Sequence, residues 1–97
     1  TNAVCMPAVL EFNASAIADR FDMAAAYLGI EGGFKGFQSF VQEFNDSLGI
    51  PRRLSEMGVK DDQLDELVRQ ALADPSCGGN PVELTAENTH QLFVDCI

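Results

Sequence analysis

The amino-acid sequence predicts an all-α fold of four main helices with one or two short ones. Apolar residues recur at spacings of three and four in several segments, and no stretch alternates apolar and polar residues long enough to form a strand. Glycines and prolines separate these segments. Since the chain has 97 residues and is 46% hydrophobic, we expect residues 1–97 to form a single helical domain with a substantial core.

The N-terminal third is predicted to hold a short helix followed by a longer one. The apolar segment Asn2–Glu11 contains Pro7, which fits a first turn or a kink. Ser15 is predicted to cap the second helix, whose apolar face extends to Leu28. Gly29 should end that helix, because glycine readily adopts the left-handed conformation found at helix stops.

A third helix is predicted after the glycine-rich turn and should end at Gly49. Its phenylalanines recur at helical spacing and form a stripe that we interpret as core: Phe34, Phe37, Phe40 and Phe44. The helix cannot continue through Ile50–Pro51, because the residue before a proline avoids the helical region. Arg52–Met57 can then form one or two further turns before Gly58.

The segment Lys60–Ala73 shows the clearest helical pattern in the chain. Its acidic residues crowd the N-terminal half, where the helix dipole favours them, and Asp65 and Arg69 are expected to form an i,i+4 ion pair. Thr85 is predicted to cap a final helix that carries Cys96 near its end. These two helices complete the predicted set of four.

The segment Asp74–Pro81 has the most unusual composition in the chain. Two prolines bracket two glycines and an asparagine, so φ is fixed at both ends while positive φ is permitted in the middle. This pattern predicts a defined loop that can bring backbone amides and small side chains close to a ligand. The alternative is a loop that merely joins two helices.

The charge of the chain argues against two classes of partner. Fifteen acidic residues against six basic ones give a net charge of -9, which repels nucleic-acid phosphates and anionic lipid. No apolar run approaches the roughly 20 residues that span a bilayer. An odd number of cysteines, which we expect to be two buried thiols and one loop thiol, fits a reducing compartment. We therefore expect a cytoplasmic protein.

Two further kinds of site have little support in the residues. There is one histidine, His90, and no C-x-x-C motif, so we expect no metal or other cofactor to be bound by this chain alone. The tripeptide Asp46–Leu48 resembles the site of the prosthetic arm in acyl carrier proteins, where the tripeptide opens a helix; here it closes one. A free-standing acidic helical carrier, modified at Ser47, or a protein-interaction module is therefore the alternative function.

Four segments together resemble the C-terminal part of the helical domain of the iron-containing (group III) alcohol dehydrogenases. The opening Asn2–Asn13 resembles the family's Asn-Ala…Leu-Pro…Phe-Asn segment, and Leu48–Val59 resembles its connector. Ala71–Asp74 resembles the end of its penultimate helix, and Gly79–Thr85 its loop into the last helix. The segments occur in the family's order and at similar spacing, and the resemblance covers nearly the whole chain.

The resemblance implies that the chain is a fragment of a dehydroquinate synthase-like two-domain enzyme. Such an enzyme catalyses reversible hydride transfer between NAD or NADP and a small alcohol or aldehyde, with Fe(II) or another divalent metal polarising the oxygen. An aspartate and three histidines hold the metal in the family, the last of them just upstream of the segment matched by Asn2–Asn13. Those ligands and the nucleotide-binding domain are absent here, and His90 matches none of them. The fragment alone is therefore expected to be inactive and to depend on the rest of the parent enzyme.

The resemblance also gives the loop a role. In the family this loop approaches the substrate entrance, so Ser76, Cys77 and Gly78 are expected at the rim of the substrate channel. Other members often carry cysteine followed by threonine where this chain has Ser76 and Cys77. No residue of this chain is expected to be catalytic.

Overall fold

The computed structural model describes residues 1–97 and contains only helices, which confirms the predicted all-α class. The four main helices are α1 (Asn2–Leu28), α2 (Gly33–Ser47), α3 (Leu64–Ala73) and α4 (Ala86–Cys96). Three short 3₁₀ helices join them, where one or two were expected: η1 (Leu54–Met57), η2 (Asp61–Gln63) and η3 (Pro75–Gly79).

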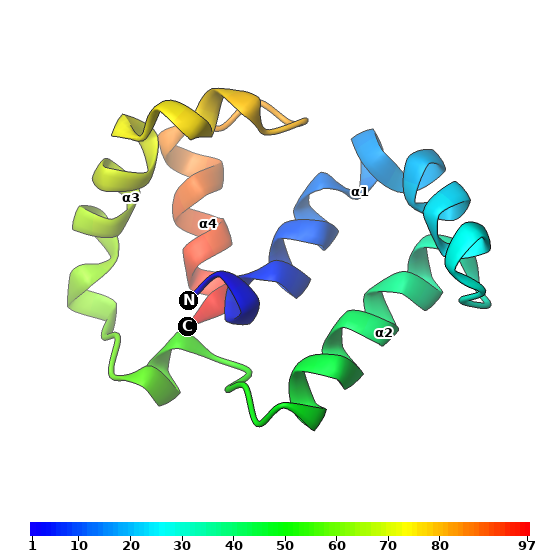
Figure 1. Ribbon diagram of the computed structural model, residues 1–97. Coiled ribbons are helices and arrows are strands. Elements are labelled where there is room, and N and C mark those ends of the chain that lie inside the picture. Colours follow the sequence, from blue (N-terminus) through cyan, green and yellow to red (C-terminus); the bar gives the residue numbers. More distant parts are fainter.

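The helices form two hairpins, one of α1 and α2 and the other of α3 and α4. The second half of α1 packs against α2, and α3 packs against α4 (Figure 1). The first half of α1 lies between the hairpins and contacts α4, so the two ends of the chain lie close together (Figure 1). The molecule measures 41 × 30 × 18 Å along its principal axes.

The prediction of two separate helices in the N-terminal third is wrong. Residues Asn2–Leu28 form one helix with Pro7 inside it, and Ser15 is an exposed residue in mid-helix that caps nothing. A cap at Ser15 would need a non-helical residue there, but the backbone stays helical on both sides of it. The two parts of α1 run in clearly different directions in Figure 1, although the helix is continuous.

The core is smaller than the composition predicts. Only 12 of the 97 residues are buried, and seven of them form two separate small clusters. One cluster joins α1 to α2 and contains Leu10, Ile17, Phe34 and Val41. The other joins α1, η1 and α4 and contains Val4, Leu54 and Cys96. The radius of gyration is 14.2 Å, against about 12.5 Å for an ordinary domain of this length.

The phenylalanine stripe of α2 lies only partly in the core. Phe34 is buried and Phe37 packs beside it, but Phe40 and Phe44 are 45% and 52% exposed and stack on each other at 5.8 Å between ring centroids. The interpretation of the whole stripe as core is therefore wrong for its second half. At the end of α1, Tyr27 is 91% exposed. The helical period identifies an apolar face, but part of that face has no covering element in this chain.

Most of the predicted helix ends are confirmed. Gly29 ends α1 with φ 74°, in the left-handed region, and Thr85 caps α4 by accepting a hydrogen bond from the Asn88 N–H at 3.2 Å. The predicted pair Asp65–Arg69 is wrong, because Arg69 instead donates from Nε to Glu66 at 2.9 Å, one residue nearer along the helix.

The start of α2 is capped by a residue of α1. Gly32, at the cap position, has no side chain, and the Phe34 N–H donates to the Asp22 carboxylate at 2.7 Å. Gly33 has φ 60°, and a Cβ there would lie 2.5 Å from the same Asp22 oxygen. A Cβ at Gly36 would collide with the Glu31 carbonyl oxygen. The turn therefore needs glycine at two positions to bring the two helices together.

Replacing Asp22 by alanine should lower the free energy of unfolding by about 1 kcal/mol, because it removes the only side-chain acceptor at the start of α2. D22N keeps one oxygen as an acceptor and should lose less. Urea-induced unfolding measures both. D19A, at an exposed position of the same helix, is the matched control; equal losses in D22A and D19A would contradict the capping role.

Candidate functional site

The predicted loop folds into the 3₁₀ helix η3, which Asp74 caps. The Asp74 carboxylate accepts hydrogen bonds from the Ser76 backbone N–H, at 2.8 Å, and from the Ser76 hydroxyl. Both bonds favour the charged form, so the pKa of the Asp74 carboxyl lies below its usual value; the hydroxyl contributes most. The Ser76 side chain therefore helps to hold the loop in this conformation.

The loop glycines do not use positive φ, so this part of the loop prediction is wrong. Neither Gly78 nor Gly79 lies in the left-handed region. The reason is that Pro75 starts a 3₁₀ helix, whose residues all have negative φ. A Cβ at either glycine would meet no atom within 4 Å, so both present open backbone to solvent.

A pair of asparagines holds the loop against α1. Asn13 donates from Nδ2 to the Asn80 side-chain oxygen at 2.9 Å, and Asn80 donates from its own Nδ2 to the Asn13 oxygen at 2.8 Å. Asn80 also donates to the Val82 carbonyl at 2.6 Å. Asn13 is buried and fully paired, so the contact has little water to compete with it.

The loop and its flanking residues line a pocket of about 470 Å³. Its lining consists of Leu72, Asp74, Cys77, Gly78, Asn80, Pro81, Glu83 and Leu84. The structure therefore places Cys77 and Gly78 at the pocket, while Ser76 lies beside it, bonded to Asp74. Leu72, Glu83 and Leu84 lie outside the predicted loop; their adjacency to it along the chain was the only signal for them.

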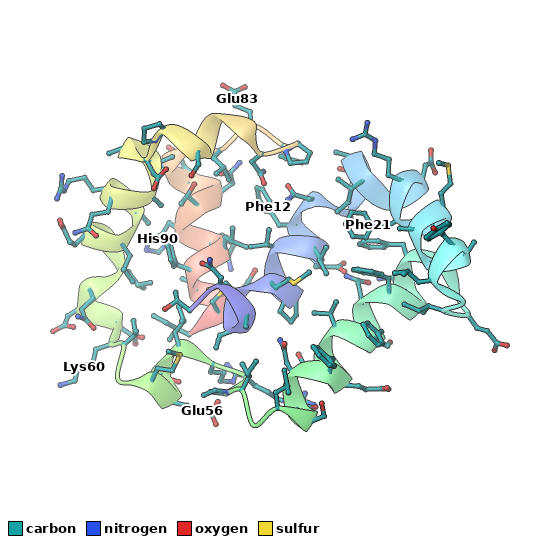
Figure 2. The ribbon with its side chains drawn as sticks, viewed as in Figure 1. Phe12, Phe21, Glu56, Lys60, Glu83 and His90 are labelled. Carbon is teal, nitrogen blue, oxygen red and sulfur yellow. The ribbon has the colours of Figure 1, made fainter.

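The pocket is suited to a small neutral molecule with polar groups. Asp74 and Glu83 are the acidic residues of the lining, no lysine or arginine lines the pocket, and Leu72, Pro81 and Leu84 supply apolar surface. Glu83 extends outward from the ribbon in Figure 2. An anionic ligand would meet two negative charges here, whereas hydroxyl or carbonyl groups can bond to exposed backbone and to carboxylate oxygens.

Potential metal-ligating side chains do not gather at one point in this chain. No group of three or more histidine, cysteine, aspartate or glutamate side chains is placed to hold a metal ion. His90 is exposed on α4 (Figure 2). The four-ligand metal site implied by the resemblance therefore does not fit the residues present here.

One other position singled out in the sequence, Ser47, can be located. Ser47 closes α2, as expected, and its hydroxyl donates to the Phe44 carbonyl at 2.6 Å. None of the helices combines the length and the apolar character required to cross a bilayer.

Residues 1–97 match the family described as Fe-containing alcohol dehydrogenase, C-terminal. Among curated proteins, the chain is 29% identical to lactaldehyde reductase of Escherichia coli strain K12 over 99 residues, which cover 95% of the chain and 26% of that protein. It is 35% identical to 4-hydroxybutyrate dehydrogenase of Cupriavidus necator, over 95% of the chain and 25% of that protein. It is also 35% identical to an alcohol dehydrogenase of Thermococcus barophilus, with the same two shares. The chain thus spans about a quarter of the length of these relatives.

Truncating either asparagine of the pair should destabilise the loop. N13A removes both bonds between the two side chains and leaves Asn80 with unpaired polar atoms, so we expect a loss of about 1–3 kcal/mol in the free energy of unfolding. The N13A/N80A double variant should lose less than the sum of the single variants.

Urea-induced unfolding of the four proteins in this double-mutant cycle gives the coupling energy. N2A, at an exposed position with no side-chain hydrogen bond, is the control for removing an asparagine from α1. Strictly additive losses would show that the two amides do not depend on each other.

Proposed function

The chain belongs to the iron-containing alcohol dehydrogenase family, and we propose that it is the C-terminal helical part of a two-domain, metal-dependent enzyme that interconverts an alcohol and an aldehyde or ketone with NAD or NADP. The observation that carries this proposal is the match of all 97 residues to the C-terminal part of that family. Relatives about four times longer are named as dehydrogenases or a reductase. The catalytic apparatus then lies outside this chain.

The small core and the uncovered apolar side chains support a parent enzyme as partner. Phe40, Phe44 and Tyr27 expose large apolar surfaces that an ordinary monomer would bury or replace by polar residues. Further chain packed on these residues would complete the core that the hydrophobic content predicts. We propose that the rest of the parent enzyme, with its nucleotide-binding domain, covers at least part of this surface.

The residues of this chain contribute shape to the active site and not its metal ligands. We propose that parts of the parent enzyme outside this chain hold the metal and the nicotinamide cofactor. The pocket beside η3 has a size and polarity suited to a small neutral alcohol or aldehyde. We place Cys77 and Gly78 at the rim of the substrate channel, with Ser76 holding the loop in shape through Asp74.

The charge of the chain supports the remaining parts of the proposal. A net charge of -9 opposes association with nucleic acid or anionic lipid, so the proposed ligands are small molecules only. A nicotinamide-linked enzyme of this kind would act in the cytoplasm.

The full-length protein and the isolated chain should differ in metal binding and activity. The full-length protein should bind a divalent ion stoichiometrically and reduce NAD or NADP when given an alcohol, while the isolated chain should do neither. Calorimetric titration with zinc or iron(II) and nicotinamide absorbance measure the two properties, with circular dichroism to verify that the isolated chain is helical. A tight single metal site on the isolated chain would contradict the proposal that the metal ligands lie outside this chain.

Enlarging Cys77 should change substrate selectivity in the full-length enzyme. C77L narrows the proposed rim, so kcat/KM for a bulky primary alcohol should fall about 10-fold, while that for a small primary alcohol stays within about threefold. S39L, at an exposed position on α2, is the control for adding a leucine to the surface. An equal effect of C77L on both alcohols, or no effect, would remove Cys77 from the channel rim.

A further inference from the structure

Two cysteines from opposite ends of the chain lie together in the second core cluster. Cys5 is in the first turns of α1, and Cys96 is the last residue of α4. Both pack in the cluster built on Val4, Leu54 and Cys96. Figure 1 shows the N and C ends of the chain side by side at this point.

Contacts around the pair hold both helix ends in place. Leu54 of η1 is the largest fully buried side chain of the molecule and packs in the same cluster. The Ser55 hydroxyl donates to the Ile97 carbonyl at 2.7 Å, which fixes the end of α4 against η1. Because both cysteines pack in one cluster, rotation of their side chains can bring the two sulfur atoms toward each other.

The two thiols differ in access and in acidity. Cys5 is half-buried and borders an open pocket of about 400 Å³, lined also by Asn2, Ala3, Met6 and Val9, whereas Cys96 is only 3% exposed. The hydrogen bond with Cys96 lowers the pKa of the Cys5 thiol to about 7. The same hydrogen bond, together with burial, raises the pKa of Cys96. Cys5 is thus the accessible nucleophile and Cys96 the protected partner.

We propose that Cys5 and Cys96 are a redox-responsive pair that closes to a disulfide when the protein meets hydrogen peroxide. The Cys5 thiolate attacks one peroxide oxygen, the O–O bond breaks, and Cys5 becomes a sulfenic acid with release of hydroxide. The Cys96 sulfur then attacks the Cys5 sulfur; the S–O bond breaks, and the departing hydroxyl takes the Cys96 proton and leaves as water. The two thiols are oxidised together by two electrons, and the peroxide is reduced to water.

The resulting bond would join the start of α1 to the end of α4, and a dithiol reductant would reverse it.

Peptide mapping of the full-length protein tests the pair directly. The reduced protein is treated with hydrogen peroxide, remaining thiols are alkylated with N-ethylmaleimide, and the digest is analysed by mass spectrometry. We expect a linked peptide containing Cys5 and Cys96 that disappears after dithiothreitol. C77S, which removes the loop thiol of the other pocket, should leave that link unchanged. C5S should abolish it and leave Cys96 as a free thiol.

The rate of alkylation of Cys5 by iodoacetamide gives an independent measurement that needs no oxidation. Its pH dependence should have a midpoint below the usual thiol value in the wild-type protein, and in C96A the midpoint should move upward because Cys96 no longer stabilises the thiolate. Two outcomes would overturn the proposal: Cys5 oxidised while Cys96 stays free, or Cys5 linked to Cys77. An unchanged midpoint in C96A would show that the two thiols do not interact.

Discussion

The amide pair between Asn13 and Asn80 is the contact on which the position of the candidate pocket depends. Helix α1 packs against both α2 and α4, and Asn13 is a buried residue of α1. Asn80 lies at the end of η3, so the two hydrogen bonds fix the loop to the one element that joins both halves of the molecule. The third bond, from Asn80 to the Val82 carbonyl, extends that restraint into the segment leading to α4. Without this pair, nothing among the side-chain hydrogen bonds would connect the loop to α1.

The importance of such polar contacts follows from the limited core. Two clusters of four and three buried residues hold the hairpins together, and they do not merge. A further polar contact lies between them: the Asn45 amide of α2 donates to the Ala3 carbonyl at 2.8 Å. Because these amides are partly shielded from water, each bond contributes more than an exposed one would, and each lost partner costs more. This arrangement is expected for a group of helices whose remaining apolar surface packs against another part of the same protein.

The sequence allowed the local features to be predicted and left the long-range ones open. Helix ends such as Gly29 and the cap at Thr85 depend on neighbours within a few positions, so their signals are local. The continuity of α1 through Ser15 was missed because a serine followed by an apolar face is equally consistent with a cap or with an exposed mid-helix position. The exposure of Phe40 and Phe44 was missed because periodicity identifies an apolar face and not what covers it.

The candidate site also combines local features that the sequence predicts with long-range features that it leaves open. Its loop could be located from prolines and glycines that occur within one short segment, and Cys77 and Gly78 do lie at the pocket. The loop's attachment could not be predicted, because Asn13 and Asn80 are 67 positions apart. Cys5 and Cys96 are farther apart still, and only the fold brings them into one cluster. The two pairs contact α1 at different points, Asn13 near its middle and Cys5 near its start. The asparagine pair attaches the segment before α4 to α1, and a disulfide between Cys5 and Cys96 would attach the end of α4 to the same helix. Changes at the two pairs should therefore not be independent.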